Sequence, residues 1–400
     1  MVKRKWEIIS NQKTNPSADD PKITTDKIIK LLLKNRGIIS SKTIAEFLHP
    51  SDPYSLTAKD VGISLRDLKN ALSRIQKAIL NKESIVVYAD YDADGITAGA
   101  IMWENLYRLG AKVMPYIPQR ENEGYGFSKQ GLDSVKSQYG PTLIISVDHG
   151  ITAFEKIAYA KKLGIDVIVT DHHVKPKILP ECIIVHTTKL CGAGISWFVI
   201  KELLGSRLID DEEQKKELLS LATIGTIADM VPLTGPNRSI VKHGLNAIKH
   251  TKRLGLQALI KNAGVEMEKL GTYEVSHLLA PRLNAMGRLV HAMDALRLLC
   301  TKQSSKAEEL AAKLGMTNRE RQLMTEETTL HAKELVKSLT LSQGSTHIKQ
   351  KLIFVTHETY NQGIIGLVAG KLVEAYHLPS IVVSKGEIIS KASARSISGF

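Results

Sequence analysis

Between residues 84 and 171 the chain alternates short β-branched runs with segments of helical period. The runs are SIVVYA, KVMPYI, TLIISV and DVIVT, and the helical segments begin near Ile96, Ser128 and Ile151. Short strands that alternate with helices are typical of a parallel sheet covered by helices. The sequence therefore predicts an α/β fold with a doubly wound, mostly parallel sheet, and CIIVH is a candidate for one more strand.

The rest of the chain is expected to form three further parts. Residues 1–60 combine a polar lead with two short amphipathic helices, and the α/β domain occupies 61–305, of which 192–305 is almost wholly helical. A long polar connecting helix and a linker follow at 306–347, a pattern typical of helices that span between domains. Residues 348–400 are predicted to form a second, smaller α/β domain, which is too short to stand alone and is expected to be incomplete.

Composition limits the class of partner. Lys and Arg number 54 against 41 Asp and Glu, a formal charge of +13, which favours a polyanion, although many basic proteins bind none. The three cysteines form no CxxC pair and are expected to be reduced thiols. With no signal-peptide pattern and no apolar run of about 18 residues, we expect a soluble, cytoplasmic protein without a membrane partner.

Acids and imidazoles follow three of the predicted strands. They are Asp90, Asp92 and Asp94 after the first, Asp148 after the third, and Asp171, His172 and His173 after the fourth. Ligands of open α/β sheets bind beyond the carboxyl ends of the strands, so these side chains are expected to meet. If the first segment is extended, its aspartates at alternate positions point the same way and repel.

Each strand-end aspartate also has a purely structural explanation, because such residues often cap helices or form Asx turns. Converging carboxylates without a cation would be costly, however, whereas divalent ions make the cluster favourable. Carboxylates with imidazoles and no thiolates suit Mn²⁺ or Mg²⁺ better than Zn²⁺. Two such ions would supply a water of lowered pKa and a Lewis acid, which predicts phosphoester hydrolysis.

The motifs DYDADGIT, SVDHGIT, TDHH and ADMVPL, in this order, resemble the DHH phosphoesterase superfamily. Together with PRLNAMGRL at 281–289, TNRERQ at 317–322, NQGIIGLVAGKLVE and KASARSISGF, they resemble its RecJ branch from about residue 45 onward. The resemblance implies a metal-dependent exonuclease that digests single-stranded DNA from 5′ to 3′ in repair and recombination. It also implies recruitment by a single-strand-binding protein or a helicase.

The resemblance carries metal-ligand roles to five positions. Asp148 is implied to bridge two ions, with Asp94, His172 and Asp229 on one ion and Asp92 on the other. Several relatives have a histidine four residues before the position of Asp92. Because Tyr88 stands there in this chain, Asp90 or water is expected to complete that site.

Two of the site residues have competing explanations. His173 is implied to contact the scissile phosphate, and the alternative is an imidazole that only holds His172 in its tautomer. Asp229 is expected at a helix C-terminus, where a carboxylate opposes the macrodipole at a cost of up to about 1 kcal/mol. Metal binding would offset that cost.

Basic and glycine-rich segments are the candidates for substrate binding. No acidic residue occurs between Asp229 and Glu266 or from Val275 to Met293, which suggests a surface along which an anionic ligand binds. By resemblance PRLNAMGRL lies beside the active site, which makes its polar side chains candidates for substrate binding. The helix start predicted near Gln362 would attract phosphate, although glycines there also serve tight packing. SARS resembles the strand of the accessory DHHA1 domain that holds nucleic acid. The candidates are Arg282, Asn284, Arg288, Gln362, Gly363, Ser393, Arg395 and Ser396.

Two alternatives stay open at this point. A DHH-DHHA1 phosphodiesterase acting on short RNAs or cyclic dinucleotides is disfavoured by PRLNAMGRL and the large helical part. An inactive DNA-binding replication scaffold is disfavoured because all five ligand positions match. A GGH-type motif and an OB-fold normally follow the SARS strand, so a chain ending at Phe400 is expected to be C-terminally truncated.

Overall fold

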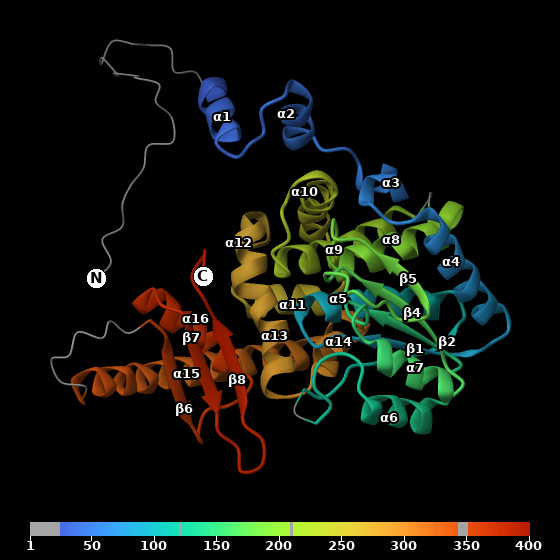
Figure 1. Cartoon of the computed structure of the whole chain (residues 1–400). Helices are drawn as coiled ribbons and strands as arrows, with labels where there is room; N and C mark the ends of the chain where they lie inside the picture. Colours follow the sequence, from blue (N-terminus) through green and yellow to red (C-terminus); the bar gives the residue numbers. More distant parts are fainter. Residues whose placement is uncertain (1–24, 121, 209–210, 343–350) are drawn as a thin grey trace, which may run out of the picture. The chain divides into compact units, whose positions relative to one another are not determined.

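The computed structural model describes residues 25–120, 122–208, 211–342 and 351–400 (Figure 1). The polar lead at 1–24 and most of the predicted linker, at 343–350, lie outside the described residues. The chain divides into two compact units: Asp52–Glu327, here called the core unit, and Met1–Ser51 with Thr328–Phe400, here called the terminal unit. The finer division at residues 60, 305 and 347 stays a prediction.

The core unit contains a five-stranded, fully parallel sheet in the order β2-β1-β3-β4-β5. The strands are β1 (Ser84–Ala89), β2 (Lys112–Tyr116), β3 (Leu143–Val147), β4 (Asp166–Asp171) and β5 (Ile183–His186). Each predicted run, CIIVH included, forms a strand, and the predicted fold class is confirmed. Because β2 and β3 flank β1 on opposite sides, the strand order reverses at β1, which is where such folds bind ligands.

Helices cover both faces of this sheet, and the alternation of side chains along β1 shows why. Ile85 and Val87 enter the larger core, whereas Val86 and Tyr88 enter a second core on the opposite face. A strand buried on both faces needs a continuous apolar run rather than an alternating one. The larger core is lined by α4 (Leu65–Leu80), α5 (Ala93–Arg108) and α8 (Gly192–Leu204), and the second by α6 (Lys129–Tyr139) and α7 (Phe154–Lys162), which lie together in Figure 1.

The helical part of the core unit packs around α5. It comprises α9 (Glu212–Ala228), α10 (Gly235–Lys249), α11 (Leu254–Asn262), α12 (Thr272–Glu274), a π-helical segment (Val275–Leu279), α13 (Ala280–Leu289) and α14 (Met293–Cys300). A buried ion network joins it to α5, because Arg253 lies 2.8 Å from Glu104 and 3.1 Å from Glu217. Short elements at the start of the unit are a 3-10 turn (Pro53–Ser55) and α3 (Ala58–Val61).

The terminal unit contains a three-stranded sheet in the order β6-β7-β8, with β7 and β8 antiparallel. Its elements are α1 (Thr25–Lys34), α2 (Ser41–Leu48), β6 (Ile353–His357), α16 (Ile365–Tyr376), β7 (Ser380–Ser384) and β8 (Lys391–Arg395). The long helix α15 (Ser304–Ser342) contributes residues to both units. None of the described helices is long and apolar enough to cross a membrane.

Candidate metal centre

The acidic segment after β1 is not extended, which corrects one expectation from the sequence. β1 ends at Ala89, and Asp92 is the N-cap of α5, its Oδ1 accepting hydrogen bonds from the N–H groups of Asp94 and Gly95, both at 3.0 Å. Asp94 therefore lies in the first turn of the helix. The three carboxylates are presented by a strand end, a cap and a helical turn, not by one face of a strand.

Asp94 is held by a second helix that sequence reasoning did not assign to the site. Its two carboxylate oxygens accept hydrogen bonds from the N–H groups of Gly192 (2.7 Å) and Ala193 (2.8 Å), at the start of α8. Free N–H groups and the positive end of the helix dipole stabilise a carboxylate there. The small residues of CGAGIS at a helix start were the signal available in the sequence.

Asp148 follows β3 in a left-handed backbone conformation, with φ of 68°. The backbone of α8 approaches it so closely that a Cβ on Gly192 would lie 2.4 Å from the Cβ of Asp148. This conformation is uncommon outside glycine, and outliers of this kind concentrate at functional sites. The geometry places the Asp148 carboxylate at the strand ends, opposite the loop after β4.

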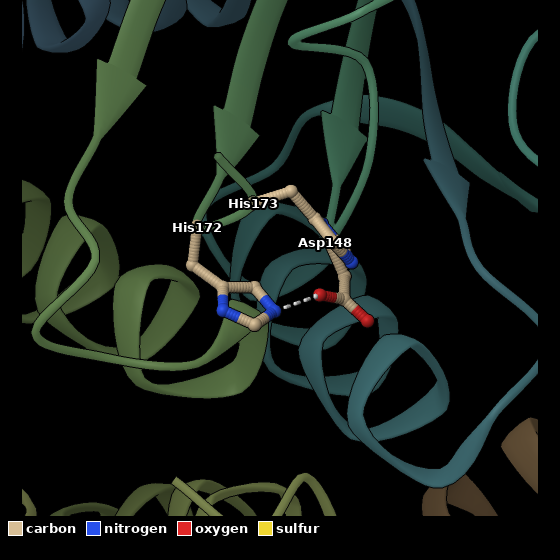
Figure 2. A group of neighbouring side chains, drawn as sticks. All are labelled: Asp148, His172 and His173. Atoms are coloured by element: carbon tan, nitrogen blue, oxygen red, sulfur yellow. Dashed lines mark ion pairs between the residues drawn. The ribbon is translucent and has the colours of Figure 1, made fainter. Parts of the chain in front are cut away.

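His172 faces this carboxylate from the loop after β4 (Figure 2). Its Nε2 lies 3.1 Å from Asp148 Oδ1, 3.7 Å from Asp229 Oδ2 and 4.0 Å from Asp94 Oδ2. Asp148 Oδ1 is buried and, apart from this ion pair with His172, makes no hydrogen bond to any described residue. Burial lowers the pKa of His172, so its imidazole is a poor counterion for this oxygen. A buried carboxylate without a full counter-charge is costly, and a bound cation would supply that charge.

Three groups of ligand atoms are close enough to share an ion. They are Asp94 with His172 and Asp229, Asp90 with Asp92 and Asp148, and Asp148 with His172 and His173, each group within 4.8 Å. The structure thus brings together every residue that the sequence proposed as a ligand. Tyr88 points to the opposite face of the sheet, among the aromatic rings of the second core.

The carboxylates of this centre are electrostatically unfavourable without cations. Burial raises the pKa of Asp90, Asp92 and Asp148, and neighbouring carboxylates raise it further. Burial, followed by the charges of Asp94 and Asp92, raises the pKa of Asp229 to about 7. Four acids that resist ionisation lie together beside the imidazoles of His172 and His173, and none of the described ligand groups contains a thiolate. This donor set fits hard divalent cations such as Mn²⁺ or Mg²⁺.

Asp171 is the first residue of the DHH triplet, and it holds His173. Burial opposes the ionisation of Asp171, but hydrogen bonds from the His173 side chain and from the backbone N–H groups of His173 and Ile151 lower its pKa to about 2. His173 Nδ1 lies 2.7 Å from Asp171 Oδ1. The structure thus shows a hydrogen bond between His173 and Asp171, and the ring of His172 packs against the ring of His173 in a tilted arrangement.

The polar side chains of PRLNAMGRL lie in different places. Asn284 Oδ1 accepts a hydrogen bond from the N–H of Ala93 (2.7 Å), which ties α13 to the start of α5. Burial and the charges of neighbouring arginines lower the pKa of Arg288 to about 10, while the charge of Asp92 acts in the opposite direction. Arg288 therefore lies by the acidic cluster, whereas Arg282 lines a separate groove between α11 and α15.

The remaining candidates lie in the terminal unit. Arg395 Nη1 donates to Ser393 Oγ at 3.2 Å, and a Cβ on Gly366 would lie 3.0 Å from that Oγ and 3.1 Å from Arg395 Nη2. The strand end of β8 and the first turn of α16 are therefore adjacent. Gln362 and Gly363 precede α16, and Ser396 follows β8.

A doubly wound parallel sheet with a carboxylate and imidazole centre at its switch point, and with a DHH triplet that begins at the last residue of the fourth strand, defines a DHH-type fold. Residues 84–226 match the DHH family, N-terminal domain. The chain belongs to the RecJ family.

The relatives support this assignment along the whole chain. The single-stranded-DNA-specific exonuclease RecJ of Bacillus subtilis is 40% identical over 100% of this chain, which spans 50% of that protein, about half its length. RecJ of Haemophilus influenzae is 30% identical, with 94% of this chain and 67% of that protein aligned.

Solved structures agree with the fold. A RecJ structure bound to manganese superposes with a TM-score of 0.72 at 33% identity, covering 84% of this chain and 83% of that one. RecJ from Thermus thermophilus, in complex with Mn²⁺, superposes with a TM-score of 0.75 at 31% identity, covering 92% of this chain and 51% of that one.

Proposed function

We propose that this chain hydrolyses the phosphodiester bonds of single-stranded DNA from the 5′ end, in a reaction that depends on divalent ions. The observation that carries the proposal is the convergence of buried carboxylates and His172 at the switch point of the sheet, in a family whose named members are single-stranded-DNA-specific exonucleases. The 5′ to 3′ polarity, the role in DNA repair and the recruitment by a single-strand-binding protein or a helicase follow from the resemblance alone.

We propose two ion sites. Asp94, His172 and Asp229 would hold one ion, Asp90 and Asp92 the other, and Asp148 would bridge them. Bound there, Mn²⁺ or Mg²⁺ would lower the pKa of a water nucleophile and neutralise charge on the phosphoryl oxygens. The buried Asp148 Oδ1, which accepts no hydrogen bond from a described residue, and the raised pKa values of the cluster support this assignment.

Other side chains would bind and orient the substrate. His173 is proposed to contact the scissile phosphate through Nε2, with its ring fixed by the hydrogen bond between Nδ1 and Asp171. Arg288 would attract a phosphate beside the cluster, and Asn284 would hold the start of α5 in place. In the terminal unit, Ser393 and Arg395 would bind the single-stranded DNA.

The test is digestion of single-stranded DNA labelled at either end, with Mn²⁺, Mg²⁺ or EDTA. Metal-dependent release of mononucleotides from the 5′ end is expected. A cyclic dinucleotide and a short RNA serve as parallel substrates. Hydrolysis of the cyclic dinucleotide or the short RNA alone would indicate a phosphodiesterase for small substrates instead. Inactivity on all substrates, with DNA binding retained, would indicate a DNA-binding scaffold.

A further inference from the structure

A groove in the helical part of the core unit shares no residue with the acidic cluster. It lies between the end of α11, the π-helical segment, α13 and α15, and has a volume of about 390 Å³. Its polar lining comes from Asn262, His277, Arg282, Asn318, Arg319 and Gln322. None of the described residues that line it is acidic, and both His277 and Arg282 fall in the acid-free stretch from Val275 to Met293.

Two arginines share this groove without a counterion. Burial, and then the charge of Arg319, lower the pKa of Arg282 from its ordinary value. Neither guanidinium forms an ion pair with any described residue. Arg282 is anchored, because its Nη1 donates to the Leu278 carbonyl at 2.6 Å and its Nε to Asn262 Oδ1 at 3.4 Å. Two guanidinium groups held together in this way repel, and an anion between them would reverse the sign of the interaction.

An exposed aromatic ring stacks on His277, one of the residues that line the groove. Tyr273 is 62% exposed and stacks on His277, with ring centroids 4.4 Å apart and an angle of 14° between the rings. His277 belongs to the π-helical segment, a rare geometry that often accompanies functional sites. Cationic grooves with adjacent aromatic faces are the arrangement by which proteins bind single-stranded nucleic acid, since bases stack on the rings while cations contact the backbone.

A glycine in α15, Gly315, lines the groove beside Asn262. A Cβ on Gly315 would lie 2.3 Å from Asn262 Oδ1, so a larger residue there would displace the Asn262 side chain. Glycine within a helix costs roughly 0.5–1 kcal/mol relative to alanine. Glycine leaves room for the Asn262 side chain, whose Oδ1 accepts the hydrogen bond from Arg282 Nε.

We propose that this groove is a second binding site for single-stranded DNA, in which Arg282 and Arg319 bind one backbone phosphate and Tyr273 stacks on a base. The identity of the ligand rests on the proposed function, and the site extends that function beyond the metal centre. A strand that reaches this groove binds more tightly than one that occupies the metal centre alone. The groove would thus favour long strands over short oligonucleotides.

Binding can be measured separately from hydrolysis. Fluorescence anisotropy of a labelled oligothymidylate of about 16 nucleotides is recorded in EDTA over a series of salt concentrations. R319Q should raise the Kd and reduce the salt slope by about 0.7, the value for one phosphate contact on a single strand. Y273A should raise the Kd about tenfold, the loss of one stacked base. Both substitutions are at exposed positions, and circular dichroism checks the fold.

R297Q is the matched control, because it removes the same charge from an exposed arginine that pairs with Asp294 outside the groove. It should leave the Kd and the salt slope unchanged. The proposal would be overturned if R319Q and Y273A bound DNA as the unsubstituted chain does, or if the unsubstituted chain did not bind DNA. Unaltered binding by the two variants would indicate another anionic partner for the groove, such as an acidic protein segment. Hydrolysis of labelled DNA by the unsubstituted chain is scored separately, so failure of the proposed function is distinguishable from failure of the groove.

Discussion

Replacing Asp229 by Asn should stabilise the metal-free protein while weakening its response to metal. Folding raises the pKa of this carboxyl from 3.8 to about 7, through burial and the charges of Asp94 and Asp92. Since one pKa unit equals about 1.4 kcal/mol, the full penalty for ionised Asp229 is about 4 kcal/mol. The side chain is 26% exposed, so solvent screening reduces this to about 2 kcal/mol.

The sign of the effect depends on pH. Folded Asp229 binds its proton more tightly than unfolded Asp229 does, so its contribution to stability falls as the pH rises from 3.8 through about 7. In EDTA at pH 8, D229N should therefore have the higher free energy of unfolding, by about 2 kcal/mol. Below pH 3.8 the two proteins should converge. The position of Asp229 at the C-cap of α9 adds a dipole term of the same sign.

Urea denaturation followed by tryptophan fluorescence measures this difference, because Trp197 is buried in the core unit. Mn²⁺ in place of EDTA should stabilise the unsubstituted protein more than D229N, since a ligand stabilises the state that binds it. A difference that does not vary with pH, or a metal response equal in both proteins, would refute the electrostatic account of the cluster.

Three other predictions follow from the geometry. His172→Ala should reduce hydrolysis to background while unfolding stays cooperative, as followed by mononucleotide release and thermal melting, and substantial turnover would remove its ligand role. Gly225→Ala should lower the free energy of unfolding in urea by about 1–3 kcal/mol and should lower the metal affinity, because the added Cβ would lie 2.5 Å from Asp94 Oδ1. A metal affinity equal to that of the unsubstituted protein would contradict this prediction. Arg395→Ala should weaken strand binding and reduce the salt slope by about 0.7 in anisotropy titrations, and an unchanged slope would argue against β8 as a strand-binding element.

The local sequence was sufficient wherever the decisive interaction is periodic or adjacent in the chain. Each β-branched run became a strand, because a strand buried on both faces requires continuous apolar residues. The placement of acids and imidazoles after β1, β3 and β4 predicted their convergence, since parallel strands end at the same edge. The order of motifs also identified the family before any fold was known.

Tertiary structure decided what depends on contacts between distant segments. Asp94 is held by backbone groups of α8 that are distant in the chain, and Arg282 lies with Arg319 rather than beside the acidic cluster with Arg288. Neither contact could be predicted from the sequence. The hydrophobic periodicity indicates which face of a helix a residue occupies, but not which other helix packs against that face. Contacts between segments that are distant in the chain, such as the packing of Gly315 beside Asn262, form only when the chain folds.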